Sequence, residues 1–399
     1  MASLLKRVGF RKRRRPAACP IPDWARRRRV AEESFVPWTN RVFPLDGRTV
    51  LEYGCGNGAI AAAFAPHVGR HVGLDIDEAG VRQGRELLEQ EGVGATLTAV
   101  PLAEIMSEVA TMRGEIDLFL CYAVLEHMAV EERLELLELA RQVVRPDGAI
   151  AVIETPNRLL PWDYHTAQLP FYSQLPDELA LRYRHRSPRR DFVDSLDAAA
   201  GQGEDALREA FTRWGRGVSY HEFELVFEDL PARTLATSWE PELLPERNVH
   251  REELVLQAAL DEIDPSLPPS FSRYWLDLII AASPPRSLPS HVRPWALTTL
   301  NSPRCEYDSA GMVQMPDADA SLSIDLPGPS KRLVLAAQST GDSVEIALAQ
   351  LDTGTAINLT AAHGPHGPAY AECRFDVAGE HYQLRLASAG IVSFVGYER

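Results

Sequence analysis

A glycine-rich turn constrains the fold of this chain more than any other part of its sequence. The turn comprises residues 52–58 (EYGCGNG), directly after the strand-like run Thr49–Leu51. Apolar residues then recur at helical spacing at positions 60, 64 and 68. Glycine lets the backbone turn sharply and lets a ligand approach it closely. A strand, a glycine turn and a helix in this order predict a site for a cofactor that contains a nucleoside.

An acidic residue at the end of a second strand supports this interpretation. The run His71–Leu74 is typical of a buried strand, and Asp75 ends it. Asp75 comes about twenty residues after the turn, the spacing at which a carboxylate accepts hydrogen bonds from both ribose hydroxyls. We therefore expect Asp75 to bind a ribose.

The periodicity of the chain predicts two folded parts. Strands are expected at 49–53, 71–75, 95–100, 116–122, 149–154 and 273–280, and helical patterns separate the earlier ones. This alternation implies an α/β domain with a doubly wound parallel sheet. Prolines and aromatic residues interrupt the pattern between about 160 and 245, which we interpret as a mostly helical insertion over the carboxyl edge of the sheet. Beyond a proline-rich linker at 284–289, short alternating runs predict an all-β sandwich.

The cofactor motifs resemble those of a known family. Residues 50–58 resemble the first motif of class I, Rossmann-type methyltransferases, residues 116–127 the fourth motif, and residues 146–149 the turn that follows it. The resemblance implies an S-adenosylmethionine-dependent methyltransferase. An acid before the glycines suits a cofactor that carries an amino group and a sulfonium better than a pyrophosphate. The implied cofactor-binding residues are Glu52, Gly54, Cys55, Gly56, Asn57, Gly58, Asp75, Ile76, Leu102, Cys121 and Tyr122.

One position departs from the family pattern. The acid that often follows the third strand is absent from Val100–Ala103. We therefore assign adenine recognition to backbone groups around Leu102. The predicted domains are a basic N-terminal arm at 1–34, a methyltransferase domain at 35–285 and a β-sandwich domain at 286–399.

Two further strings bear on the methyl acceptor. Residues 154–166 and 216–223 are similar to bacterial methyltransferases associated with surface polysaccharide and glycan synthesis. This resemblance implies O-methylation of a sugar hydroxyl of a glycan or glycosylated intermediate. Two alternatives stay open: an O-methyltransferase of a small aromatic or quinone-like acceptor, and a non-catalytic component that binds cofactor and glycan.

Histidines near the expected carboxyl edge are candidate bases. Methyl transfer to a hydroxyl needs alignment of the reactants and removal of a proton. His127 follows the fourth strand and His165 the fifth, and Asp163 is placed to orient His165 or to bind a metal. Each histidine is also compatible with a loop-stabilising role. No compact acidic cluster appears beyond Glu154 and Asp163, so we assign no metal-binding residues. The candidate substrate-binding residues are Asn157, Trp162, Tyr164, Tyr220 and His221.

Charge and cysteine content bear on partners and compartment. The net charge is −15, yet residues 1–30 hold eleven Lys/Arg and one acid. This basic arm is either a contact for an anionic membrane surface or a solvated tail. The acidic remainder argues against a nucleic-acid substrate. Five scattered cysteines and the lack of a long apolar run lead us to expect a cytoplasmic protein without a membrane span.

Overall fold

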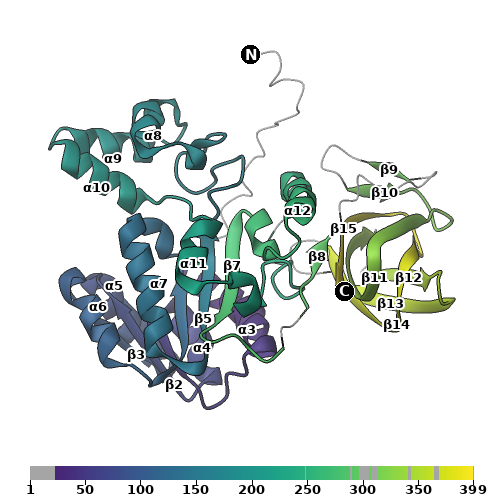
Figure 1. Cartoon of the computed structure of the whole chain (residues 1–399), viewed down its shortest axis with the longest axis horizontal. Coiled ribbons are helices and arrows are strands. Elements are labelled where there is room, and N and C mark those ends of the chain that lie inside the picture. Colours follow the sequence, from purple (N-terminus) through teal and green to yellow (C-terminus); the bar gives the residue numbers. More distant parts are fainter. Residues whose placement is uncertain are drawn as a thin grey trace.

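The computed structural model describes residues 23–247, 249–287, 290–295, 305–307, 312–339, 343–363 and 368–398. Most of the predicted basic arm lies outside these ranges. The described part of the chain forms an α/β unit and an all-β unit that lie side by side (Figure 1).

A seven-stranded sheet forms the centre of the α/β unit, with the order β3-β2-β1-β4-β5-β7-β6. Strands β1 to β5 are parallel, whereas β7 runs antiparallel to β5 and β6 antiparallel to β7. The predicted doubly wound fold is therefore confirmed. The strands are β1 (Thr49–Tyr53), β2 (Arg70–Asp75), β3 (Thr96–Ala99), β4 (Ile116–Tyr122), β5 (Val144–Pro156), β6 (Thr234–Ala236) and β7 (Trp275–Ala281).

Helices cover both faces of this sheet, which is why its central strands are apolar on both sides. Every residue of β4 is buried. One face packs against α6, α7 and α11, and the other against η1, α3 and α4. The helices up to β5 are α2 (Asp23–Val30), η1 (Ala31–Phe35), α3 (Val36–Val42), α4 (Ala59–Phe64), η2 (Ala65–His67), α5 (Glu78–Glu91), α6 (Leu102–Thr111), η3 (Leu125–His127) and α7 (Val130–Val143).

The structure differs from the predicted strands at two places. Strand β5 begins at Val144 rather than at residue 149, and its register with β4 breaks before Ala149. The predicted turn at 146–148 is therefore a bulge inside the strand. Strand β6 lies within the predicted insertion, and its three residues are too few to show a periodic pattern.

The insertion is mostly helical, as predicted. Helices α8 to α10 stand above the rest of the α/β unit in Figure 1 and enclose a small apolar core around Tyr172, Phe192 and Phe211. The helical elements after β5 are η4 (Tyr172–Gln174), α8 (Asp177–Tyr183), η5 (Arg184–Arg186), α9 (Arg190–Ala200), α10 (Glu204–Trp214), α11 (Tyr220–Phe227), η6 (Leu230–Arg233), α12 (Arg251–Ile263) and η7 (Pro269–Ser272).

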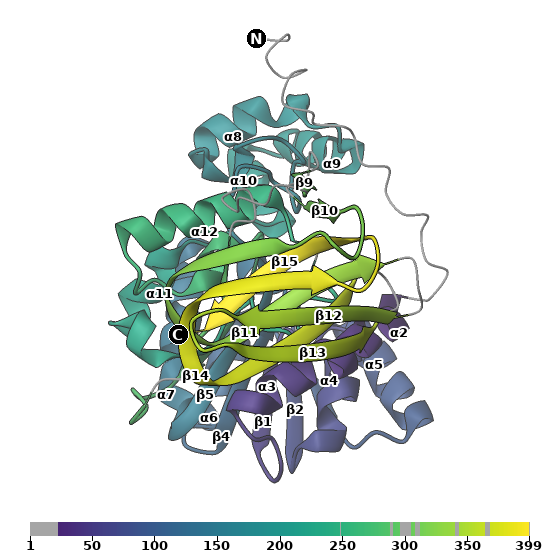
Figure 2. The ribbon, with the colours of Figure 1, turned by 90° about the vertical axis from the view of Figure 1, so that its right-hand side faces the viewer.

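The C-terminal unit is all-β, as predicted, and its strands form one continuous antiparallel sheet (Figure 2). The order is β13-β12-β14-β11-β15-β10-β9, with β8 paired to β15. Residues 322–326 and 332–336, two of the short alternating runs of this part of the chain, belong to one long strand whose register shifts around Ser330. The strands are β8 (Arg293–Pro294), β9 (Glu306–Tyr307), β10 (Val313–Met315), β11 (Leu322–Ser339), β12 (Ser343–Gln350), β13 (Thr355–Ala362), β14 (Ala369–Leu386) and β15 (Gly390–Glu398).

A buried contact joins the two units. The Trp239 indole stacks on the Phe394 ring, with centroids 5.6 Å apart. The Arg332 guanidinium lies 3.1 Å from the Glu240 carboxylate, and both side chains are buried. Alternate residues of β11 face the core of the β unit, and Val334 and Ala336 face this contact. The all-β unit is thus packed against the α/β unit.

Within the described ranges, no helix combines the length and the apolar character needed to cross a membrane. The four cysteines that the structure describes are free thiols.

Candidate functional site

The glycine turn after β1 is held against the ends of β2 and β4. Gly54 has φ +78°, and a Cβ at this position would lie 2.4 Å from Val124 Cγ2. The Gly56 amide donates a 2.6 Å hydrogen bond to Asp75 Oδ2. The turn therefore needs glycine for its conformation and its close approach to β4, and the Asp75 carboxylate fixes its position.

A cleft of about 410 Å³ opens beside this turn at the carboxyl ends of the parallel strands. Of the predicted cofactor residues, Gly54, Asp75, Ile76 and Leu102 line it. Ile76 and Leu102 are 54% and 52% exposed, which is unusual for large aliphatic side chains. The other lining residues are Tyr53, Ile105, Met106, Ala123, Val124, His127, Met128, Glu132, Glu135 and Arg213.

Some predicted cofactor residues lie beneath the cleft rather than in its wall. Cys55 and Cys121 are buried in apolar clusters, and the Tyr122 hydroxyl donates to the Glu154 carboxylate. Ala123 and Val124 occupy the lining position instead. Gly56, Asn57 and Gly58 remain in the turn itself, where Asn57 O accepts a hydrogen bond from the Trp24 indole of α2.

Glu52 is completely buried behind the turn, next to a buried histidine. Its Oε2 lies 3.5 Å from His71 Nε2, and neither atom has a hydrogen-bond partner among the described residues. Burial, and then the nearby Asp75 carboxylate, raise the pKa of Glu52 well above its ordinary value. Burial lowers the pKa of His71 to about 4. Glu52 is therefore a buried carboxyl group close to the cofactor turn, and the neutral His71 beside it supplies no positive charge.

A second cavity of about 450 Å³ adjoins the cleft and shares His127 and Arg213 with it. The insertion supplies most of its wall. Its lining combines polar or charged groups with apolar surface and consists of His127, His165, Arg189, Ser195, Ala210, Arg213 and Trp214. The two predicted base candidates thus meet in one cavity, although 38 residues separate them in the sequence.

Glu126, which the sequence analysis did not single out, lies between the two histidines. Its Oε1 is 3.8 Å from His127 Nε2 and 4.0 Å from His165 Nε2. The two imidazole centroids are 5.3 Å apart. Gly215 closes the group from the insertion: its φ is +102°, and a Cβ there would lie 2.5 Å from His165 Cε1. The one signal in the sequence for a functional role of Glu126 is its position shortly after a predicted strand and directly before His127.

Burial sets the protonation of this group. It raises the pKa of Glu126 to about 8. Burial lowers the pKa of His127, and burial followed by the charges of His127 and Arg189 lowers that of His165 to about 4. Both imidazoles are therefore neutral at pH 7, with a lone pair available for a proton or a cation.

A buried arginine of α7 fixes the segment that carries Glu126 and His127. Arg133 Nε donates to Met128 O at 2.9 Å, and its Nη2 donates to Arg216 O at 3.0 Å. Its Nη1 lies 3.0 Å from Glu222 Oε2. This guanidinium therefore ties the segment after β4 to residues 216–222 of the insertion.

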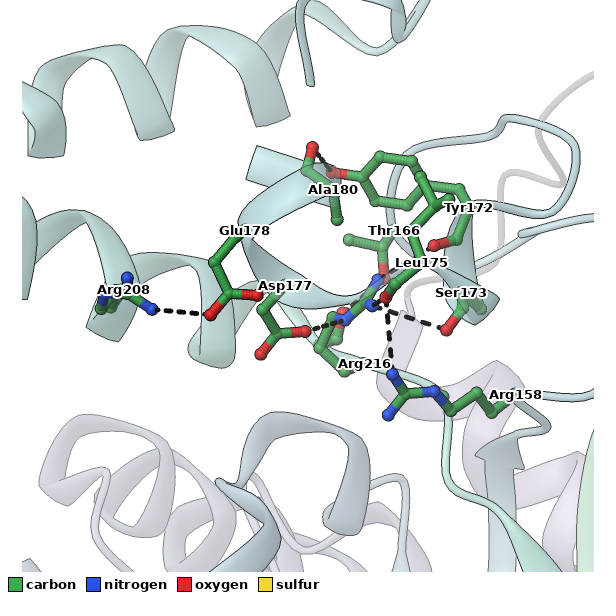
Figure 3. A network of polar contacts seen from close by, with 12 residues as sticks. Arg158, Thr166, Tyr172, Ser173, Leu175, Asp177, Glu178, Ala180, Arg208 and Arg216 are labelled. Carbon is green, nitrogen blue, oxygen red and sulfur yellow. Dashed lines mark hydrogen bonds and ion pairs between the residues drawn. The ribbon is translucent and has the colours of Figure 1, made fainter. Parts of the chain in front are cut away.

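Arg216 fixes the other side of the insertion (Figure 3). Its Nη2 donates to Leu175 O at 2.6 Å, and its Nε lies 3.2 Å from Asp177 Oδ1. Its backbone amide donates to Glu126 O at 2.7 Å. The start of α8 is thereby linked through one residue to the Glu126 segment.

The remaining predicted residues have structural contacts. Asp163 accepts hydrogen bonds from the backbone amides of residues 165–167, so it shapes the loop that presents His165 and does not touch the imidazole. The Asn157 amide donates to Phe271 O and Arg273 O.

The aromatic candidates pack against other rings. Tyr220 packs on Phe271 and donates to Glu224, and exposed His221 lies beside it. Tyr164 packs edge-on against Tyr274, and Trp162 lies beside Tyr164. Of the five predicted substrate residues, all of them described, none lines the cleft or the second cavity.

Comparison with known proteins identifies the type of domain that contains the glycine turn. Residues 50–148 match a family described as "Methyltransferase domain". The chain is similar to the ubiquinone biosynthesis O-methyltransferase of Pseudomonas paraeruginosa, with 28% identity over 31% of this chain and 50% of the relative. The corresponding Bordetella avium protein is 32% identical over 29% of this chain and 45% of the relative. The chain thus spans about half the length of the curated relatives it matches.

Two solved structures are similar to part of this chain. One is magnesium protoporphyrin IX methyltransferase (ChlM) from Synechocystis PCC 6803 with bound SAM: 21% identity, TM-score 0.28, covering 34% of this chain and 61% of that one. The other is PKMT2 from Rickettsia typhi in complex with AdoHcy: 16% identity, TM-score 0.35, covering 66% and 55%. Residues 50–148 form a methyltransferase domain.

Proposed function

We propose that this chain, whose residues 50–148 form a class I, S-adenosylmethionine-dependent methyltransferase domain, methylates a sugar hydroxyl of a glycan or glycosylated intermediate. The observation that carries the proposal is the second cavity, which combines hydrogen-bonding groups with apolar surface and meets the cofactor cleft at His127. An acceptor in this cavity would face a methyl donor in the cleft.

The cleft suits S-adenosylmethionine in three respects. The Asp75 carboxylate at the end of β2 is placed for the ribose hydroxyls, as in other nucleoside sites at this edge of a sheet. The exposed side chains of Ile76 and Leu102 offer apolar surface for the adenine ring. The buried Glu52 carboxyl group lies directly behind the glycine turn, so it would act on the methionine part through the turn and not by direct contact.

The reaction balances without another co-substrate. The acceptor oxygen attacks the methyl carbon as the carbon–sulfur bond breaks, and the electron pair of that bond stays on sulfur. The acceptor proton passes to an imidazole Nε2 of His127 or His165, both of which are neutral. The products are the methyl ether and S-adenosylhomocysteine.

The lining of the second cavity favours a hydroxylated acceptor. Two imidazoles, two guanidinium groups and Ser195 offer hydrogen bonds, while Ala210 and Trp214 supply the apolar surface. The Arg189 guanidinium lies over the Trp214 ring at 4.7 Å, which places a donor beside an aromatic surface. This combination matches a sugar, whose hydroxyls and C–H faces alternate, better than a largely apolar quinone.

Two other functions compete with this proposal. The curated relatives are ubiquinone biosynthesis O-methyltransferases, which favours an aromatic or quinone-like acceptor, but the similarity covers about half of their length. A non-catalytic component would bind the cofactor and transfer nothing. For partners and compartment, we propose a cytoplasmic protein without a nucleic-acid substrate, in which the basic arm contacts an anionic membrane surface.

A transfer assay separates these functions. The protein is incubated with methyl-labelled S-adenosylmethionine and a panel of sugars, nucleotide sugars, cell-envelope extract and phenolic acceptors. We expect label in a sugar-containing product, and no label with Asp75→Ala, which lacks the ribose carboxylate. Label only in a phenolic or quinone product would overturn the acceptor. Cofactor binding with no labelled product anywhere in the panel would favour the non-catalytic component.

A further inference from the structure

We propose that Glu126, His127 and His165 bind a divalent transition-metal cation between the cofactor cleft and the second cavity. The three side chains come from η3, which follows β4, and from the loop that follows β5. One oxygen and two nitrogens of these side chains lie within 4.8 Å of one another. The sequence shows no compact acidic cluster beyond Glu154 and Asp163, and His165 is distant from Glu126 and His127 along the chain, so no metal-binding residues are predicted from it.

The hydrogen bonds of His127 leave one ring nitrogen as an acceptor. Its Nδ1 lies 2.9 Å from the backbone carbonyl oxygen of Arg213. A carbonyl oxygen only accepts, so Nδ1 carries the proton. Nε2 is then unprotonated in the neutral ring, and it faces Glu126 Oε1 at 3.8 Å.

The same reasoning applies to His165. Its Nδ1 lies 3.2 Å from Thr166 Oγ1, and the Thr166 hydroxyl donates its single proton to Gly215 O at 2.6 Å. Thr166 Oγ1 must therefore accept from His165 Nδ1. The Nε2 lone pair of His165 then faces Glu126 Oε1 at 4.0 Å.

Three acceptor atoms therefore converge, and no side chain among the described residues places a donor between them. A protonated Glu126 does not resolve this, because 3.8 and 4.0 Å exceed the roughly 3 Å reach of an O–H···N hydrogen bond. The carboxyl group is 1% exposed, and its Oε2 has no hydrogen-bond partner among the described residues. A buried polar group in this state needs an explanation, and a bound cation supplies one.

The arrangement also has the features of a prepared metal site. Histidine ligands usually donate their second ring N–H to a carbonyl or another oxygen, which fixes the tautomer and the ring orientation. Both histidines do so here. Ligand bonds to the cation would be about 2.0–2.2 Å long. To form them, the Glu126 oxygen and the two imidazole nitrogens would each move toward the others by at most about 1 Å.

The donor set selects the class of cation. Two imidazole nitrogens and one carboxylate suit Zn²⁺, Co²⁺, Fe²⁺ or Mn²⁺, whereas Mg²⁺ and Ca²⁺ prefer oxygen ligands. Three protein ligands leave at least one coordination position open. His127 lines both the cleft and the second cavity, so an open position here is accessible to an acceptor.

A role for the cation follows if the proposed O-methylation is correct. An acceptor hydroxyl bound to the cation loses its proton to water at a lower pH than a free hydroxyl does. The acceptor oxygen would then attack the methyl carbon, and the electron pair of the broken bond would stay on sulfur. With the cation bound, His127 and His165 would hold it as ligands, and water would take the proton that an imidazole accepts when the cation is absent.

Metal binding can be measured without acceptor or turnover. The full chain is freed of metal with a chelator and titrated with Co²⁺ and Zn²⁺ by calorimetry, and the visible d–d absorption of Co²⁺ is recorded. We expect one site in the wild type and weaker binding of Mg²⁺. Loss of a residue that only orients a metal ligand commonly weakens metal binding by about 10–100-fold. Glu126→Gln, His127→Ala and His165→Ala each change a ligand itself, so each should weaken Co²⁺ binding by about 100-fold or more.

The control variant is His185→Ala, which removes an exposed histidine of the same insertion and should bind Co²⁺ like the wild type. Circular dichroism reports that each variant is folded, because His127 itself lines the cofactor cleft. An absence of Co²⁺ and Zn²⁺ binding in the wild type would overturn the site, as would wild-type affinity in His127→Ala and His165→Ala. Metal binding without methyl transfer to any acceptor would support the site and refute the proposed function. Full methyl transfer by the chelated protein would refute the role of the cation.

Discussion

The ion pair between Arg133 and Glu222 should be a main support of the site, and replacing Arg133 with methionine tests it. The two side chains are 2% and 7% exposed, and their charged atoms are 3.0 Å apart. The Arg133→Met variant leaves the Glu222 carboxylate buried without its partner. Removal of one member of a buried ion pair typically costs about 3–5 kcal/mol. For a domain of a few hundred residues this corresponds to a Tm lower by roughly 6–20 °C.

The same helix offers a matched control. Arg141 of α7 pairs with Glu138 at 2.7 Å, but these side chains are 38% and 39% exposed. An exposed pair contributes about 0–1 kcal/mol, so Arg141→Met should leave the Tm nearly unchanged. Both variants lose one positive charge from the same helix and gain the same side chain. A difference in Tm between them therefore reports the burial and the contacts of Arg133.

Thermal and urea unfolding followed by circular dichroism would measure both variants. A second substitution, Glu222→Gln, removes the stranded charge and keeps an acceptor for the Ser219 amide, which Glu222 binds at 2.9 Å. The double variant should therefore recover part of the stability lost in Arg133→Met. Equal stability of Arg133→Met and Arg141→Met would refute the claim that this buried pair holds the insertion to the segment after β4.

Three further predictions concern the cofactor, the second cavity and the contact between the two units. Asp75→Ala removes the acceptor of the Gly56 amide and the proposed ligand of the ribose hydroxyls. Two charge-assisted hydrogen bonds contribute about 1.5–3 kcal/mol each, so the Kd for S-adenosylmethionine, measured by calorimetry, should rise roughly 10²–10⁴-fold. An unchanged Kd would contradict the ribose assignment. Gly215→Ala places a Cβ 2.5 Å from His165 Cε1, which should displace the imidazole. The affinity for Co²⁺ should therefore fall while the affinity for the cofactor stays normal. An unchanged Co²⁺ affinity would show that the imidazole positions do not depend on this glycine. Trp239→Ala removes a fully buried indole at the contact with the β unit, so the free energy of unfolding should fall by about 3–5 kcal/mol. If the variant resists limited proteolysis as well as the wild type does, the contact between the units is not tight.

The cofactor half of the molecule follows from local sequence signals. The turn at 52–58, its flanking strand and Asp75 lie within 27 residues of one another. Glycine geometry, apolar runs and the strand-end acid each depend on neighbours in the chain, and the structure confirms the sheet they predict. The predicted residues at the end of β4, Cys121 and Tyr122, lie beneath the cleft, and Ala123 and Val124 line it, because sequence alone does not show which residue of a strand end turns into the cleft.

The acceptor half depends on contacts between distant segments. Asn157 and Tyr220 were predicted to bind substrate, but their polar groups serve backbone and side-chain partners elsewhere. Conversely, Glu126 gained significance only because Thr166 and Gly215 orient His165 toward it.

The sequence by itself therefore determined the cofactor fold, and the tertiary structure decided which side chains share the second cavity. The physical reason is that a histidine becomes a ligand or a base through its distance to other groups, its burial and the partner of its second nitrogen. In this chain those properties arise where an insertion with its own small apolar core brings His165 to the segment that carries Glu126 and His127. No periodicity in the sequence encodes that packing, whereas the turn, the strands and their order are set by steric and hydrophobic rules that act over a few residues.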